Sequence, residues 1–347
     1  MPLAEAAFPS PSSVPTVADI PFGAEPRPIA VYYEHPQWFR PLFAELDRRG
    51  VHYEAIRADQ LVFDPSTPWS GRYSLFLNRM SPSAWERGRG GSVFFTQHLL
   101  HHLEAQGVRV WNGSAAYGLD ISKGSQLSLL QRLGVRVPRT KVVYRAEQLA
   151  AASDGLEFPL VVKPNIGGNG AGVVRVGSRA ELEDASASGE LVSGPDGVFL
   201  LQEYHPPKDG AIVRAETLGG RLLYAIRLHL GDARSFSLCP ADVGCTLDGR
   251  ALAANARAAD HGGNGARAEH FQPPPAAVAE IESVARAAAM DVGGVEYLVS
   301  ERDGERYYYD VNALSNFIAD PLNVVGFDPT ARLVDALVGQ LEATAAA

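Results

Sequence analysis

The sequence predicts a mixed α/β (α+β) protein in which a small parallel sheet is followed by antiparallel hairpins. Between residues 28 and 111, short apolar runs alternate with stretches of helical periodicity, the pattern of a parallel sheet covered by helices. Further along, apolar runs come in pairs around Gly219-Gly220 and Asp303-Gly304, which indicates hairpins. Between these two regions, a lysine-bearing apolar run leads directly into a cluster of glycines.

Length, composition and charge limit the possible functions. The 347 residues are 46% hydrophobic, which suffices for two or three domains with substantial cores. The net charge of -9 argues against nucleic acid or an anionic membrane as a partner, because those surfaces bind proteins with an excess of Lys and Arg. Residues 1–27 are expected to form a flexible tail, and no apolar stretch approaches the roughly 20 residues that span a bilayer. We therefore expect a cytoplasmic protein.

The two cysteines, Cys239 and Cys245, lie in a loop-like segment. Two thiols cannot form a metal site alone, and a cytoplasmic setting disfavours a disulfide. They are either incidental reduced thiols or part of a mobile loop over a substrate, and the sequence does not assign their role.

The first parallel sheet is predicted from strands at residues 29–33, 51–56, 73–77 and 108–111, with helices near 38–49 and 93–106. Ligands of such sheets bind beyond the carboxyl ends of the strands, which here are segments 34–36 and 78–81. Arg79 could hold a substrate carboxylate with two hydrogen bonds, or it could be a surface arginine paired with an acid. Asn112-Gly113-Ser114 is interpreted as a turn.

The glycine cluster is interpreted as a phosphate clamp. Apolar runs at 160–162 and 173–176 flank it, and its glycines allow the backbone to approach an anion closely. Lys163 stands before the glycines, whereas protein kinases place their lysine after them. The G-x-x-x-x-G-K-[ST] motif is absent, and the dinucleotide motif needs a helix where this chain has a second strand. The alternative is an ordinary glycine-rich hairpin with a solvated lysine.

The remaining elements follow from periodicity and turn signals. Helices are expected at 120–133, with Lys123 in the first turn, and at 275–290. A strand is expected at 199–205, and hairpins join 212–217 to 221–230 and 295–300 to 306–311. Residues 237–271 have poor periodicity and are interpreted as a functional loop.

A metal site is predicted from the last hairpin. Glu296 lies on one strand, and Asp310 and Asn312 lie on one face of the other. All three supply hard oxygen ligands, which suit Mg²⁺ shared with phosphates. Two carboxylates about 4 Å apart would repel by about 4 kcal/mol at an effective dielectric near 20 unless a cation lay between them. The alternative is that the acids face solvent on an edge hairpin.

In this order, the clamp and the acidic hairpin resemble the ATP-grasp superfamily, nearest its glutamate-ligase and glutathione-synthetase branch. The resemblance covers residues 118–341. It implies an ATP-grasp fold of two α+β subdomains, preceded by a small Rossmann-like parallel α/β domain. The implied division is a tail at 1–27, the first α/β domain at 28–116, and an ATP-grasp domain at 117–342 with subdomains at about 140–204 and 205–342.

The resemblance also implies roles for individual residues. ATP would contact Lys123, Lys163, the loop of Gly167, Gly168, Asn169, Gly170 and Gly172, and the adenine- and ribose-binding residues Gln202, Glu203, Tyr204 and His205. Arg227 would hold the transferred phosphate. Arg214 is similar to an arginine on the first strand of the central hairpin, although the acid usually found two residues earlier is Ile212 here. The catalytic residues would thus be Arg227, Lys163 and Arg214, and the metal ligands would be Glu296, Asp310 and Asn312. Ser315 and Asn316 would contact substrate after the last metal ligand, and Asn78 and Arg79 would do so from the end of their strand.

The implied activity is ATP-dependent ligation of a carboxylate to an amine through an acylphosphate, with release of ADP and phosphate. The implied cofactors are ATP and two Mg²⁺ ions, which Mn²⁺ can replace. The partners would be small-molecule or peptide acids and amines, and a homodimer is expected. Many of these ligases continue with Pro-Gly after the last metal ligand, whereas this chain has Ala313-Leu314-Ser315-Asn316-Phe317, which leaves the substrate unassigned. Two other functions remain open: a small-molecule kinase and a non-catalytic ATP-binding regulatory module.

Overall fold

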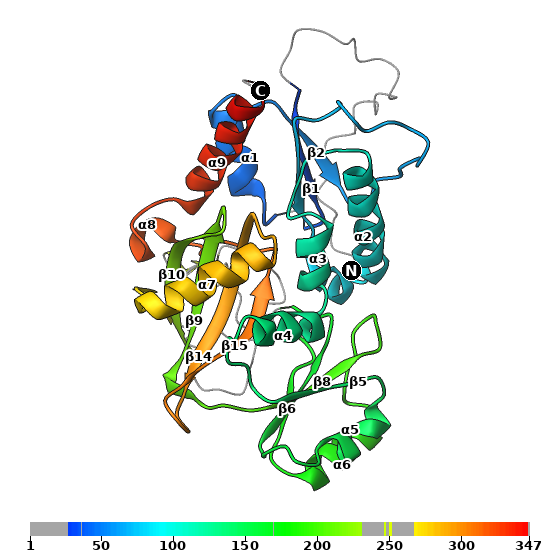
Figure 1. Ribbon diagram of the computed structural model, residues 1–347, viewed down its shortest axis with the longest axis vertical. Coiled ribbons are helices and arrows are strands. Elements are labelled where there is room, and N and C mark those ends of the chain that lie inside the picture. The colour runs from blue at the N-terminus through cyan, green and yellow to red at the C-terminus, as the bar shows by residue number, and fades with distance from the viewer. Residues whose placement is uncertain are drawn as a thin grey trace.

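The computed structural model describes residues 27–35, 37–168, 170–230, 246–247, 250–251 and 267–345. Three larger sheets, here called A, B and C, lie around a central region (Figure 1). This mixed architecture, with a parallel sheet followed by antiparallel ones, confirms the predicted fold class.

Sheet A is parallel, with strand order β2-β1-β3-β4. Its strands are β1 (Ile29–Tyr33), β2 (Tyr53–Arg57), β3 (Leu75–Arg79) and β4 (Val110–Trp111). One face packs against α2 (Gly90–Ala105) and α3 (Ser114–Asp120). The other packs against α1 (Arg40–Arg48) and the final helix α9 (Pro329–Ala345). The end of the described chain therefore returns to the first sheet.

Sheet B is antiparallel, with strand order β5-β8-β6-β7. It contains β5 (Thr140–Val143), β6 (Leu160–Pro164), β7 (Val174–Val176) and β8 (Phe199–Glu203). The 3-10 turn η2 (Ala146–Gln148) and the helices α5 (Leu149–Ala152) and α6 (Arg179–Ser188) accompany it. Because β6 pairs with β7, the glycine cluster connects two hairpin strands as predicted.

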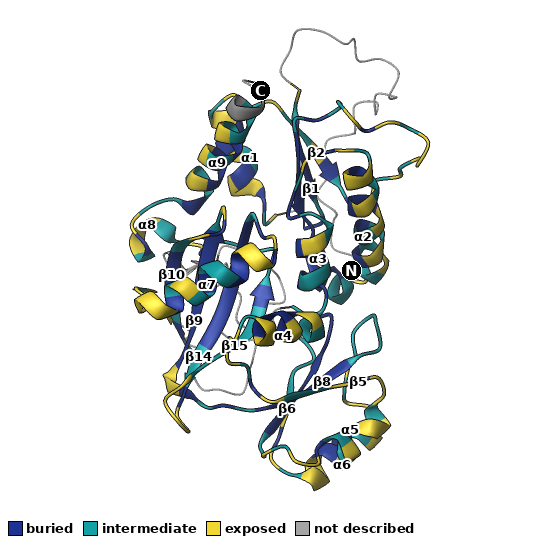
Figure 2. Cartoon of the chain, viewed as in Figure 1, coloured by how far each residue is buried: buried dark blue, intermediate teal, exposed yellow. Residues whose placement is uncertain are grey.

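Sheet C is antiparallel, with strand order β13-β10-β9-β14-β15. Its strands are β9 (Pro207–Leu218), β10 (Arg221–His229), β13 (Arg267–Phe271), β14 (Val292–Ser300) and β15 (Arg306–Asn312). Helix α7 (Pro275–Ala287) packs on one face, where side chains of the strands and the helix form a common apolar core. Figure 2 shows these strands mostly buried and the outer side of α7 exposed. The other face of sheet C carries residues of the candidate site.

The structure corrects several predicted elements. The helix expected at 120–133 breaks at Ile121, and Ser122 caps a new helix, α4 (Lys123–Arg132), by accepting from the Ser125 amide. The last five residues of the predicted loop at 237–271 form β13. Also within that loop, β11 (Thr246–Leu247) pairs with β12 (Arg250–Ala251), while Cys239 and Cys245 lie outside the described residues. The helices α6, α8 (Pro321–Val324) and α9 and the 3-10 turn η1 (Pro82–Arg87) were not predicted.

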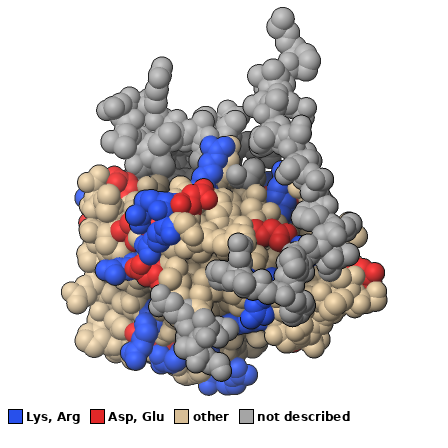
Figure 3. Space-filling model, turned by 90° about the horizontal axis from the view of Figure 1, so that it is seen from above, with Lys and Arg blue, Asp and Glu red and all other residues tan. Residues whose placement is uncertain are grey.

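Surface charge is mixed rather than segregated. On the face shown in Figure 3, several basic side chains lie against acidic ones. Near the junction of α1 and α9, for example, Arg49 pairs with Glu45 and with Asp335. Among the helices that the structure describes, none has the length and apolar character needed to cross a membrane.

Candidate active site between the three sheets

A cavity open to solvent lies where the three sheets meet. Its volume is about 230 Å³, just below the roughly 300–1,000 Å³ typical of small-molecule sites. Sheet B contributes Lys163 and Gln202, sheet C contributes Arg214, Glu296 and Asp310, and the region after β1 and β3 contributes Trp38, Ser81 and Ser83. Residues distant in sequence therefore share one cavity.

Two lysines form the cationic side of the cavity. Lys163 on β6 is buried, and its ammonium donates to Gln202 Oε1 over 3.0 Å. Burial and the nearby charge of Lys123 lower the pKa of Lys163 to about 7. Lys123, the first residue of α4, forms an ion pair with Asp310. The cavity thus holds one lysine whose pKa lies near neutral pH and one whose charge is balanced by a carboxylate.

The glycine loop lies beside these lysines. Gly167, Gly168 and Gly170 line the cavity, and Gly170 and Gly172 have positive φ of 72° and 70°. Gly172 packs against Pro164 instead of lining the cavity, and Asn169 lies outside the described residues. A Cβ on Gly168 would fall 2.6 Å from Ser83 Cβ. The loop therefore rests against the η1 turn with no room for a side chain at that point.

The carboxylates lie on sheet C, where Asp310 contacts Lys123. Glu296 on β14 stands directly opposite Asp310 on β15, and Asn312 Nδ2 donates to Asp310 Oδ2 over 3.3 Å. Burial would raise the pKa of Asp310, but the charges of Lys123 and Lys163 outweigh it and hold that pKa below its usual value. Burial raises the pKa of Glu296 despite the nearby Arg214. Each carboxylate thus has a cationic side chain as its present counter-ion.

Arg214 on β9 joins this group through three of its nitrogens. Nε donates to Glu216 over 2.6 Å, one terminal nitrogen donates to Glu296 over 2.8 Å, and the other donates to Ser315 Oγ over 2.9 Å. Arg214 lines the cavity, whereas Glu216 and Ser315 are fully buried behind it. The arginine is therefore held between the predicted metal ligands and a buried acid.

The opposite end of the cavity is formed by the end of β8 and the segment after it. Gln202, Glu203, Tyr204 and His205 all line it. Glu203 accepts hydrogen bonds from Arg139 and from the Glu157 amide, so its carboxylate is already engaged. His205 stacks on Tyr307 with ring centroids 3.9 Å apart, and burial lowers its pKa. A neutral imidazole and apolar neighbours such as Leu298 suit a planar base.

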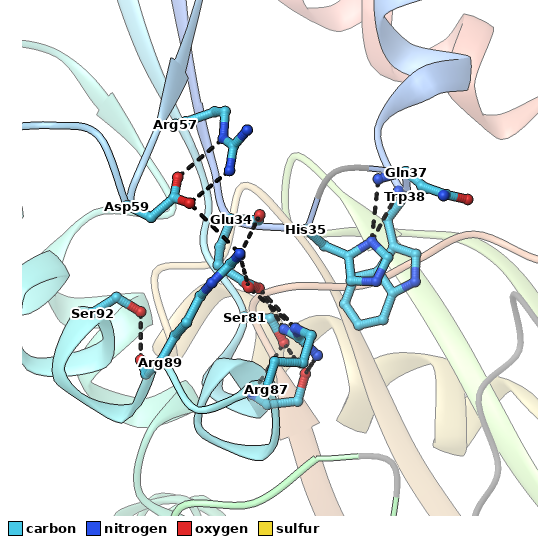
Figure 4. Close-up of polar contacts among 11 residues, drawn as sticks. Glu34, His35, Gln37, Trp38, Arg57, Asp59, Ser81, Arg87, Arg89 and Ser92 are labelled. Carbon is cyan, nitrogen blue, oxygen red and sulfur yellow. Dashed lines mark hydrogen bonds and ion pairs between the residues drawn. The ribbon is translucent and has the colours of Figure 1, made fainter. Parts of the chain in front are cut away.

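A cluster of polar side chains after β1 and β3 supports the part of the cavity lined by Trp38, Ser81 and Ser83 (Figure 4). The fully buried Glu34 accepts from Arg87 over 3.1 Å and from Arg89 over 2.7 Å, and these arginines lower its pKa although burial opposes them. His35 stacks on Trp38 at 4.1 Å, and Arg87 lies over the same indole at 5.2 Å. The cluster fixes Trp38 and the start of η1 against the cavity.

Besides Gly172, four predicted residues do not line the cavity, and their placement corrects the assignments. Arg227 stands opposite Val213 and Glu269, so it lies on the α7 face, over the Phe271 ring at 4.4 Å. Asn78 binds the Asn112 carbonyl and the Met80 amide. Arg79 is 3% exposed and donates to the Ser315 carbonyl, while Ser315 itself is 0% exposed. Asn316 does line the cavity.

The structure brings several residues to the site that were not predicted from the sequence. Glu216 is two residues from Arg214 on one strand, so the period of a strand places both on one face; that spacing was the available signal. Trp38, Ser83 and Tyr309 line the cavity with no motif to mark them. Among the described residues, no group of three or more His, Cys, Asp or Glu side chains could hold a metal.

Known proteins resemble parts of this chain, although no family model matches it. A probable alpha-L-glutamate ligase 2 of Shewanella frigidimarina is 30% identical over 140 residues, which are 40% of this chain and 46% of that protein. A D-alanine–D-alanine ligase of Pseudomonas entomophila is 32% identical over 133 residues, 38% of this chain and 40% of that protein. The chain therefore matches less than half the length of these curated relatives.

Solved structures match over nearly the whole chain. The ATP-grasp ligase PsnB, complexed with a minimal precursor, superposes with a TM-score of 0.63 at 18% identity, covering 91% of this chain and 100% of PsnB. PsnB is also known with Mg and ADP. A D-alanine–D-alanine ligase of Bacillus anthracis complexed with ATP has a TM-score of 0.62 at 16% identity, covering 92% and 98%. The chain has the ATP-grasp fold, which confirms the resemblance drawn from its sequence.

Proposed function

We propose that this protein is an ATP-dependent carboxylate–amine ligase. One observation carries the proposal: two lysines and a glycine loop meet two carboxylates, an amide and an arginine across a single cavity. Phosphoryl transfer needs positioned positive charge and metal ligands more than covalent chemistry from the protein. This set of groups supplies both.

ATP and Mg²⁺ are the cofactors that this site fits. Glu296, Asp310 and Asn312 offer hard oxygen ligands on neighbouring strands, and the two acids are already paired with cationic side chains. Bound there, Mg²⁺ would neutralise charge on the nucleotide phosphates. We further propose that two ions bind and that Mn²⁺ can replace them. The complexes of PsnB with Mg and ADP and of the B. anthracis ligase with ATP support this assignment by analogy of fold.

The lysines and Arg214 are assigned to the phosphates. When a nucleotide binds, Lys123 would exchange Asp310 for a phosphate oxygen, and Lys163 would take up a proton as it contacts another. Arg214 replaces Arg227 in the role of holding the transferred phosphoryl group, because it is the arginine beside Glu296 at the cavity. Charge that develops on that group would be met by fixed donors.

The reaction would proceed in two balanced steps. A substrate carboxylate oxygen attacks the γ-phosphorus, the bond from that phosphorus to ADP breaks, and an acylphosphate forms. An amine then attacks the acyl carbon, inorganic phosphate leaves, and the nitrogen loses a proton to give an amide. Since acylphosphates hydrolyse, the glycine loop against η1 would help to exclude water.

The acid and amine are assigned to the wall formed by Trp38, Ser81, Ser83 and Asn316. The curated relatives, a probable alpha-L-glutamate ligase and a D-alanine–D-alanine ligase, favour amino acids or peptides as substrates, as does the precursor peptide bound to PsnB. The division at residues 28–116 and 117–342, a homodimer and a cytoplasmic location remain part of the proposal.

A two-stage assay tests the proposal. Amino acids and short peptides are screened with MgATP and hydroxylamine, which converts an acylphosphate to a coloured hydroxamate, and productive acids are then offered amines with ADP release and product mass as readouts. A ligase gives hydroxamate with an acid and amide with an acid and an amine. Phosphorylated acceptor formed without an amine would indicate a kinase instead. The absence of nucleotide binding would refute the proposal altogether, with Asp310→Asn as the matched inactive control.

A further inference from the structure

Arg214 is surrounded by a network that extends well behind the cavity. Its Nε donates to Glu216 Oε1, and Ser315 Oγ donates to the other oxygen of the same carboxylate. Ser315 Oγ also accepts from a terminal nitrogen of Arg214 over 2.9 Å. The guanidinium, the carboxylate and the hydroxyl thus form a closed ring of hydrogen bonds, and Glu216 and Ser315 are both 0% exposed.

The neighbouring strand is shaped to make room for this ring. Gly294 on β14 stands opposite Glu216, and a Cβ there would fall 3.2 Å from Glu216 Oε2 and 3.4 Å from Arg214 Nε. Any larger residue would push the carboxylate or the guanidinium aside. The tight fit leaves Arg214 little freedom to turn.

The network also reaches the first sheet. Arg79 at the end of β3 donates to the backbone carbonyl of Ser315, so sheet A fixes the segment that carries the Ser315 hydroxyl. Among the described residues, Arg79 Nε and one terminal nitrogen have no hydrogen-bond partner, and no carboxylate forms an ion pair with it. Glu216 is the acid whose charge acts most strongly on this buried guanidinium. Glu216 therefore serves two buried arginines.

This arrangement matters because Arg214 is shared between two acids. Under the proposed function, on which this inference rests, Glu296 would bind the metal when nucleotide binds, and Arg214 would lose its hydrogen bond to that carboxylate. We propose that Glu216 and Ser315 are positioning residues that keep Arg214 aimed at the transferred phosphoryl group after that exchange. Neither lines the cavity, so their effect on the transferred phosphoryl group would pass through Arg214.

The first test is a double-mutant cycle. Glu216→Gln and Ser315→Ala are measured in the wild-type and Arg214→Ala backgrounds by MgATP- and acid-dependent hydroxamate formation with the acid that the screen identifies. We expect each single variant to lower kcat about ten- to a hundred-fold with less than about a threefold change in KM for ATP, and to add less than about twofold once Arg214 is absent. Ser315→Thr, which keeps the hydroxyl, should regain more activity than Ser315→Ala. If the loss of kcat in a double variant equals the product of the losses in its two single variants, the inference is overturned. A wild-type kcat in Glu216→Gln overturns it as well.

A matched control and a second readout separate this inference from the proposed function. Glu269→Gln also removes a carboxylate beside an arginine, but on the opposite face of sheet C, and it should leave kcat unchanged. The Arg214 Nε–H resonance, assigned by its loss in Arg214→Lys, should exchange slowly with solvent in the wild-type protein and fast in Glu216→Gln. Failure to form hydroxamate with any acid would count against the ligase, whereas an unchanged exchange rate in Glu216→Gln would overturn the positioning role by itself.

Discussion

Val213, Ala225 and Val295 pack under α7 on one face of sheet C, while Arg214 and Glu296, the next residues along the same strands, face the cavity on the other. The α7 face excludes water and gains stability from apolar burial. The cavity face buries charges that cost stability unless each finds a partner. The same hairpins therefore support two different environments, and a shift of one residue moves a side chain from one to the other.

The largest expected effect comes from comparing Arg214 with Arg227 on the β9–β10 hairpin. Arg214→Ala should lower acid-dependent turnover by about a hundred- to a thousand-fold, the usual cost of losing one contact to a group that develops charge. Arg227→Ala should stay within about threefold of wild type, because Arg227 lies over Phe271 on the α7 face. Hydroxamate formation measures both, with thermal unfolding as a check on folding. Equal losses in the two variants would erase the distinction between the faces.

A smaller effect is expected where the glycine loop meets the η1 turn. Gly168→Ala places a methyl group 2.6 Å from Ser83 Cβ, so the loop must move away from the phosphates, and turnover should fall roughly tenfold. Ser83→Gly in the same chain removes the clash and should restore most of the activity. Gly118→Ala, whose Cβ would meet nothing within 4 Å, is the control. A fully active Gly168→Ala would show that the loop does not need this contact.

The α7 face should respond in stability and not in activity. Ile281 on α7 is 0% exposed in the apolar core, and Ile281→Val should lower the free energy of unfolding by about 1 kcal/mol. Urea unfolding gives this value, and turnover per folded molecule should equal that of the wild type. A large loss of turnover in fully folded Ile281→Val would contradict this prediction, because it would show that packing on the α7 face affects the cavity face.

The smallest expected effect is a pH dependence confined to the cavity face. Burial lowers the pKa of Lys163 to about 7, and phosphate charges would raise it again in the complex, so the complex binds more protons than the free protein. MgATP affinity should therefore fall as pH rises above 7, roughly fivefold between pH 7 and 8, and level off below pH 6. Titration calorimetry in buffers of different ionisation enthalpy measures the proton uptake. Lys163→Met removes the contribution of the lysine to the pH dependence of MgATP affinity. If that dependence is unchanged in the variant, it arises from the nucleotide and not from Lys163.

Much of the fold could be predicted because its turns carry strong local signals. The hairpins around Gly219-Gly220 and Asp303-Gly304 and the strands flanking the glycine cluster follow from glycine position and apolar runs. The break between α3 and α4 was missed because the apolar positions continue in helical spacing across Ser122, whose capping role became clear only in the structure. Helix α9 packs on sheet A far from its place in the sequence, so local periodicity gave no clue to its partner.

The site was predicted less evenly. Glu296, Asp310 and Asn312 follow from the period of two paired strands, and the structure places them together. Arg79 was expected to contact substrate from its place at a strand end, and Ser315 from the resemblance, because it follows the last metal ligand. Neither signal says which way a side chain turns, and both side chains turn inward. Arg227 was misassigned because resemblance supplied an arginine without the hairpin register that decides its face.

Lys123 is paired with Asp310 and Arg214 with Glu296. Under the proposed function, a divalent ion that arrived alone would have to displace these tethered cations and would gain little by binding. A nucleotide that arrived with the metal would offer phosphate oxygens to the displaced lysine and guanidinium. We therefore expect the metal to bind with or after the nucleotide.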